Sequence, residues 1–209
     1  MHPYLIRLGI SPEVQELFLP FYAEGEADLV FQQGNYREHF GLAFHRLSPG
    51  GESWLAGETN LTWVNHAFIA SSAIDLMAFL QNAGQTLPNW GRLLFVATGV
   101  MPSAGQLCWI RENLSGKKLT LLFPNDLIGK ISDLKIAAAL RGLPAAAFLA
   151  EKERLTVCFR AREYHFDQQN FSLAAFERAA NYRFKVVTRK PKHGASFYEQ
   201  LKAGAFTSI

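Results

Sequence analysis

The chain has 209 residues, of which 49% are hydrophobic and 19% are charged, so it has enough apolar sequence for a buried core. Its net charge of +3 is compatible with a nucleic-acid partner but does not require one. The longest apolar run is far shorter than the ~20 residues of a membrane helix, and the first residues lack the pattern of a signal peptide. We therefore expect a single domain over residues 1–209, in the cytoplasm and without a membrane partner.

The first part of the chain, residues 1–63, predicts a small antiparallel module. Ser11 followed by Pro12 is typical of a helix start, and Pro20 is expected to end that helix. A strand is expected at 28–31. Segments 41–47 and 52–55 are expected to form a hairpin, because the Pro and paired Gly between them favour a turn.

From residue 64 the pattern changes to apolar strands that alternate with helices. Strands are expected at 67–70, 93–97 and 119–123, and helices at 71–80, 103–113 and 131–140. Uninterrupted apolar strands of this kind are typical of a parallel sheet covered on both faces. We therefore predict the α/β class, with these three strands as parallel neighbours in a core over residues 64–143.

Residues 144–209 predict a C-terminal extension with a basic tail. Strands are expected at 145–149, 155–159 and 163–166, then a helix at 172–182 and a last strand at 184–188. The extension is thus a hairpin, a helix and a strand. Positive charge concentrates in its second half, at Arg178, Arg183, Lys185, Arg189, Lys190, Lys192 and Lys202.

The segments that follow the three core strands are ASSAID at 70–75, ATG at 97–99 and PNDLIG at 124–129. In this order and spacing they resemble the Toprim domain of topoisomerases, bacterial primases and primase-like proteins of mobile elements. The resemblance covers about residues 64–143, with a looser similarity at 190–201. It implies a Rossmann-like parallel core, in which a Glu after the first strand shuttles a proton and an Asp-x-Asp after a later strand holds magnesium.

The acids of that family are largely missing from this chain. Ser71 stands where the resemblance places the Glu, and Pro124 where it places the first Asp, which leaves Asp126 as the one expected metal ligand. Ser196 stands where primase-type members have a further Asp. Serine and proline cannot replace a carboxylate as a proton shuttle or magnesium ligand near neutral pH. We expect no catalytic residue and no cofactor, beyond weak Mg²⁺ binding at most.

The leading hypothesis is a catalytically degenerate Toprim-like protein that binds DNA or RNA, or is an accessory component of DNA replication or mobile-element processing. The predicted nucleic-acid contacts are Lys130, Arg189, Lys190, Lys192 and His193. The three basic residues at 189, 190 and 192 flank a strand end, and their replacement is expected to weaken nucleic-acid binding while affecting folding little. Phe197 and Tyr198 are also candidates for stacking on bases.

Three alternatives stay open. An active magnesium-dependent nuclease or primase-type enzyme could use Asp126 together with Asp133, Glu112 or Asp75. The chain could instead be a structural adaptor that binds other proteins. His39 and His45 are spaced like residues that face one metal, but no third zinc-type ligand stands near them. Cys108 and Cys158, the only cysteines, are expected to be core residues.

Overall fold

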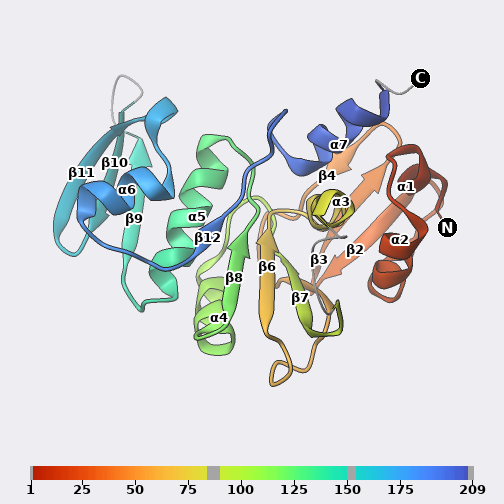
Figure 1. Cartoon of the computed structure of the whole chain (residues 1–209), viewed down its shortest axis with the longest axis horizontal. Helices are drawn as coiled ribbons and strands as arrows, with labels where there is room; N and C mark the ends of the chain where they lie inside the picture. The colour runs from red at the N-terminus through yellow and green to blue at the C-terminus, as the bar shows by residue number, and fades with distance from the viewer. Residues whose placement is uncertain (1, 84–89, 150–153, 207–209) are drawn as a thin grey trace.

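A computed structural model describes residues 2–83, 90–149 and 154–206 (Figure 1). The N-terminal part contains helices α1 (Pro3–Arg7) and α2 (Pro12–Phe18), the 3-10 turn η1 (Leu19–Phe21), and strands β1 (Ala23–Glu24), β2 (Asp28–Gln33), β3 (Tyr36–Gly41) and β4 (His45–Arg46). The central part contains β5 (Trp54–Gly57), β6 (His66–Ala70), α3 (Ala73–Ala83), η3 (Trp90–Arg92), β7 (Leu93–Ala97), α4 (Ala104–Leu114), β8 (Lys118–Leu121) and α5 (Leu127–Ala139). The C-terminal part contains β9 (Ala145–Leu149), β10 (Arg154–Phe159), β11 (Arg162–Asp167), η4 (Gln168–Asn170), α6 (Leu173–Ala180), β12 (Val187–Thr188) and α7 (Phe197–Phe206).

The described strands form three sheets, and the chain is a mixed α/β protein. The central sheet has the order β12-β8-β6-β7-β5. β6 pairs in parallel with both β7 and β8, and β12 pairs in parallel with β8. The expected parallel arrangement of the three apolar strands is therefore confirmed, with β6 between the other two.

The central sheet is covered on both faces, as its apolar strands require. Phe68 and Phe95 point to the face where α3 packs, and α2 packs against the same hydrophobic cluster. Ile69 and Val96 point to the opposite face and share a second cluster with residues of α4 and α5. Because side chains alternate along a strand, a strand with both faces covered must be apolar throughout.

The two smaller sheets flank this core on opposite sides (Figure 1). β1 to β4 form an antiparallel sheet in chain order, which confirms the antiparallel character of the N-terminal module. β9, β10 and β11 form an antiparallel sheet on the other side, where α6 packs against them.

The structure corrects one strand pairing and two element boundaries that the sequence predicted. The hairpin of 41–47 with 52–55 is wrong, because β5 pairs antiparallel with β7 in the central sheet, while the nearby hairpin joins β2 and β3. The segment with the Pro and Gly residues instead connects β4 of the N-terminal sheet to β5 of the central sheet. Helix α5 begins at Leu127 rather than 131, since Asp126 caps it. The last strand, expected at 184–188, is only Val187–Thr188. Lys185 has a positive φ of 61°, which is not an extended conformation, so the strand begins after it.

Candidate functional site

The end of β6 and the start of α3 lie where the resemblance places a catalytic Glu. Ser71 is 3% exposed, and its hydroxyl has no hydrogen-bond partner among the described residues. The next residue, Ser72, closes a cap at the start of α3: its Oγ accepts from the Asp75 N–H at 3.0 Å and donates to Asp75 Oδ2 at 2.8 Å. Ser72 thus has a structural role that explains its side chain fully.

A carboxylate from another sheet reaches the same helix start. Glu38, on β3, is fully buried, and its Oε2 accepts from the backbone N–H of Ala73 at 2.9 Å. Its Oε1 pairs with Nε2 of His45 at 2.9 Å. The N-terminal sheet is therefore tied to the parallel core by a buried acid at the positive end of a helix, where negative charge is favoured.

Asp75 connects this helix start to the C-terminal helix. Its Oδ1 accepts from the backbone N–H of Tyr198 at 2.9 Å, and the Ser196 hydroxyl also hydrogen-bonds to it. Burial raises the pKa of the Asp75 carboxyl, although these hydrogen bonds and the nearby His45 act in the opposite direction. The structure therefore places Ser196 and the end of β6 together.

Asp126 lies at the same edge of the sheet but has a different partner. Asp126 is exposed. Its Oδ1 accepts from the backbone N–H of Gly129 at 2.7 Å, so Asp126 is the N-cap of α5. Gly129 packs so closely on Pro124 that a Cβ there would clash with the Pro124 carbonyl. The backbone of Asn125 donates to the Ala195 carbonyl at 2.8 Å, so the segment before α7 crosses this edge.

Lys190 is held inside the protein, which corrects its prediction as an exposed charge. Its Nζ lies 2.6 Å from Asp133 Oδ2 and donates to the carbonyls of Phe123 and Pro124 at 2.9 and 3.1 Å. Asp133 is 1% exposed, and its Oδ1 has no hydrogen-bond partner within the described chain. Burial raises the pKa of Asp133 to about 6 against the pull of the Lys190 ammonium.

The acids of the enzymatic alternative are not gathered into one site. Asp133 is held by Lys190, Asp75 faces α7, and Glu112 is an exposed residue of α4 beside Arg111. Within residues 2–83, 90–149 and 154–206, no group of three or more His, Cys, Asp or Glu side chains could hold a metal ion. Among the described residues, Asp126 therefore belongs to no such group.

The paired histidines of the N-terminal module have separate carboxylate partners. His39 Nδ1 lies 2.7 Å from Asp28 Oδ2, whereas His45 bonds to Glu38.

The two cysteines differ from the prediction that they are core residues. Cys108 is exposed and Cys158 is half-buried.

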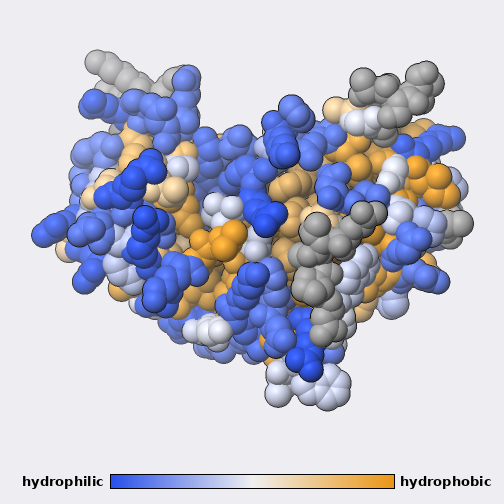
Figure 2. All heavy atoms as spheres, viewed as in Figure 1, coloured by the Kyte–Doolittle hydropathy of each residue, from blue (hydrophilic) through white to orange (hydrophobic). Residues whose placement is uncertain are grey.

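A pocket of about 590 Å³ lies between the end of β12, α3 and α7. We call it the basic pocket; its lining residues are Phe79, Asn82, Ala83, Arg189, Lys190, Lys192, Phe197 and Gln200. It has three cationic side chains and no acidic one among these residues. Figure 2 shows hydrophilic residues gathered over the chain between β12 and α7.

The cations of the basic pocket differ in solvent exposure and in their partners. Arg189 and Lys192 are exposed, and the positive charge of Arg189, with that of Lys118, adds to burial in lowering the pKa of His66 to about 4. Gln200 Oε1 accepts from the backbone N–H of Lys192 at 2.6 Å, which fixes the loop that carries it. His193 is exposed beside this loop.

The other predicted contacts lie apart or are buried. Lys130 is on α5, where its Nζ reaches the Gln169 carbonyl at 3.5 Å. Phe197 is 6% exposed and packs edge-on against Phe79, and Tyr198 packs against Phe40. The rings proposed for base stacking are thus used mainly in packing.

The part of the chain that the structure describes contains no helix long and apolar enough to cross a membrane. No protein-family model, curated protein or solved structure matches the chain. Inference about function therefore depends on the residues and geometry above.

Proposed function

We propose that this chain is a Toprim-like protein without the family's catalytic acids, and that it binds nucleic acid through the basic pocket. It would be an accessory component of DNA replication or mobile-element processing rather than an enzyme. The observation that carries the proposal is the basic pocket itself: a concave site whose described lining has no carboxylate and three cations, of which Lys190 is paired with Asp133 while Arg189 and Lys192 are exposed. Phosphates are the common anions that such a surface attracts.

The arrangement of the acids supports a binding role over catalysis. Phosphoryl transfer needs a metal held by carboxylates, or a base within reach of the reacting oxygen. Here Glu38, Asp75 and Asp133 are buried and bonded within the protein. Asp126 caps its own helix. Arg189 and Lys192, by contrast, are exposed and available to phosphates.

The test is fluorescence anisotropy with labelled single- and double-stranded oligonucleotides, at salt between about 50 and 200 mM. The variant is Arg189→Ala with Lys192→Ala, which spares the ion pair of Lys190. We expect weaker binding at low salt and a salt slope that is flatter by roughly one unit per lost phosphate contact.

The matched control is Arg162→Ala with Arg178→Ala, two exposed residues of the β9–β11 side of the molecule. It removes the same charge at a distance from the basic pocket. Equal weakening by both variants would mean general electrostatic attraction, and no binding by the parent protein would leave the adaptor hypothesis in place.

Magnesium separates this proposal from the enzymatic alternative. We expect calorimetry to give no Mg²⁺ affinity tighter than about millimolar, since a single carboxylate is a poor magnesium site. Labelled oligonucleotides should stay intact with Mg²⁺ or Mn²⁺. Micromolar affinity that Asp126→Ala abolishes, or metal-dependent cleavage, would favour the enzyme.

A further inference from the structure

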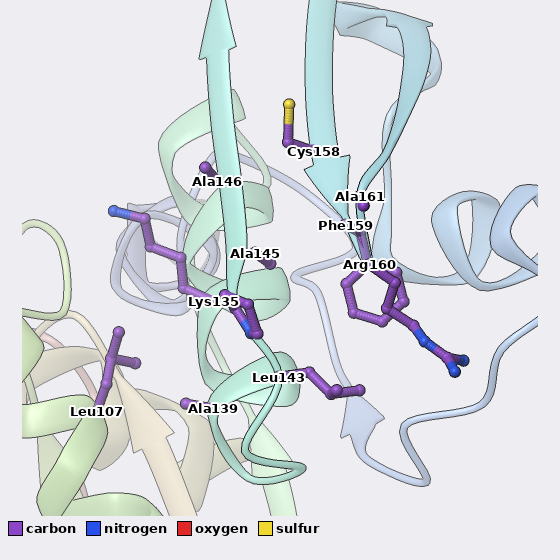
Figure 3. Close-up of a pocket in the computed structure, with 11 residues that line it drawn as sticks. Leu107, Lys135, Ala139, Leu143, Ala145, Ala146, Cys158, Phe159, Arg160 and Ala161 are labelled. Atoms are coloured by element: carbon purple, nitrogen blue, oxygen red, sulfur yellow. The ribbon is translucent and has the colours of Figure 1, made fainter.

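A second pocket, of about 400 Å³, lies where α4 and α5 meet the sheet of β9 to β11. Figure 3 shows that its lining comes from α5, from the start of β9 and from the turn between β10 and β11. The lining is mainly aliphatic, with Leu107, Leu143 and Phe159 as its large apolar members. This volume lies within the range of small-ligand sites, which are typically apolar with a few polar groups.

Two cations line this otherwise apolar pocket, and no acid does. Lys135, half-buried on α5, has its Nζ 3.0 Å from the thioether sulfur of Met101. A thioether is a weak acceptor and leaves the positive charge uncompensated. Arg160 also lines the pocket, but Figure 3 shows its side chain pointing away from Lys135. Its guanidinium lies over the Tyr182 ring, 5.7 Å from the ring centre. Neither cation forms an ion pair with a described carboxylate.

The turn that carries Arg160 adopts an unfavourable backbone conformation. Phe159 pairs with Arg162, so Arg160 and Ala161 form a two-residue hairpin turn, and both have positive φ angles, of 51° and 61°. Such turns usually have Asn-Gly, because other residues pay a steric cost in the left-handed region. Both residues that bear this cost also line the pocket. Unfavourable backbone geometry that persists beside a pocket points to a functional site.

We propose that this pocket binds a small amphipathic anion, a free carboxylate with a short aliphatic or aromatic body. The body would replace water against Leu107, Leu143 and Phe159, and the carboxylate would meet the Lys135 ammonium. The aliphatic lining favours an apolar body, and the Lys135 ammonium, whose hydrogen-bond acceptor is the Met101 sulfur, favours a negative head. This site is separate from the basic pocket, and the proposal does not depend on nucleic-acid binding.

The test compares octanoate with octanol as probes of the full chain. Calorimetry or ligand-observed NMR should show octanoate binding more tightly than octanol, because only octanoate offers a charge to Lys135. Lys135→Met keeps most of the side-chain length and should weaken octanoate by about tenfold, the value of one charge-assisted hydrogen bond. Lys135→Arg should keep most of the affinity, and octanol should bind both variants like the parent.

Lys130→Met is the matched control, since it removes one positive charge from the same helix outside the pocket. It should leave octanoate binding unchanged. Thermal unfolding of each variant shows whether the fold is intact. Cys158 gives a second measurement, because it lines the pocket and octanoate should slow its alkylation in a Cys108→Ser background. Equal affinity for octanoate and octanol, no binding of octanoate, or an unchanged Lys135→Met variant would overturn the proposal.

Discussion

The ion pair of Lys190 with Asp133 gives a sharp prediction about stability. Lys190→Met would remove an ammonium 2.6 Å from a carboxylate that is 1% exposed, and two hydrogen bonds to backbone carbonyls. Removal of one partner from a buried pair commonly costs about 3–5 kcal/mol, because the remaining charge is buried without compensation. Since Lys190 itself is 23% exposed, we expect the lower end, about 3 kcal/mol at pH 7.5.

The loss should depend on pH with a defined sign. Asp133 has a pKa of about 6 in the folded protein, above the ordinary aspartate value of 3.8, and without Lys190 that pKa would rise further. A raised carboxyl pKa stabilises the fold below the unfolded pKa, and this contribution is lost as the pH rises through the folded pKa. The deficit of Lys190→Met should therefore shrink toward pH 4.5. The low pKa of His66 affects parent and variant alike, so it cancels in the difference.

Urea unfolding of parent and variant at pH 7.5 and 4.5 measures the effect, and a loss of this size should lower the melting temperature by roughly 6–12 °C. The double variant Lys190→Met with Asp133→Asn should recover at least half of the loss, since no buried charge then remains. A loss below about 1 kcal/mol at pH 7.5, typical of an exposed pair, would refute the reasoning, as would equal losses at both pH values.

Two further variants test other parts of the structure by the same measurement. Glu38→Gln should destabilise the protein by about 1–3 kcal/mol, because it weakens the buried contacts to α3 and to His45. A free energy of unfolding equal to that of the parent within experimental error would contradict the role of Glu38 as a link between sheets. Arg160→Asn with Ala161→Gly should stabilise the protein by about 1–2 kcal/mol, because the turn then has its preferred residues; a lower melting temperature would show that the parent turn is not costly.

The parallel core could be predicted from the sequence because its strands are apolar at every position. Ala67–Ala70 and Leu93–Ala97 leave no polar residue for a solvent face, so both faces must be covered, and helices between the strands favour parallel pairing. The N-cap role of Asp126 was not predicted, although Asp followed by an apolar helical pattern is a usual helix start. The Toprim resemblance implies metal binding at this residue instead.

The pairing of β5 could not be predicted from local signals. Trp54–Gly57 follows a turn-forming segment, so a hairpin with the preceding strand was the natural expectation. The structure instead places it beside β7, where Gly57, with a positive φ of 84°, packs against the Leu93 carbonyl. Which partner an edge strand takes is decided by tertiary packing, here by Trp54 against Phe18 and Phe31.

The buried acids were the main feature missed at the site. Glu38 and Phe40 share the buried side of β3, and an acid in such a position indicates a specific partner. One partner, His45, is close in the sequence, but the other lies 35 residues away at Ala73. Lys190 was likewise read as part of a charge run. Nothing in the local sequence distinguishes it from Lys192, and only the packing of α5 against this edge makes Asp133 its partner.

The placement of Glu38 bears on where a phosphate would bind. At a strand end that leads into a helix, the free backbone N–H groups and the positive helix end would normally attract an anion. In this chain the Glu38 carboxylate already occupies the N–H of Ala73, and Asp75 lies one turn away in the same buried network. A phosphate there would have to displace or approach two carboxylates, of which Asp75 already accepts from the Tyr198 backbone N–H. The basic pocket, on the other side of α7's first turn, has no such repulsion among its described residues. If nucleic acid binds this protein, the charges therefore favour contact through Arg189 and Lys192 rather than through the position where the family's proton shuttle would stand.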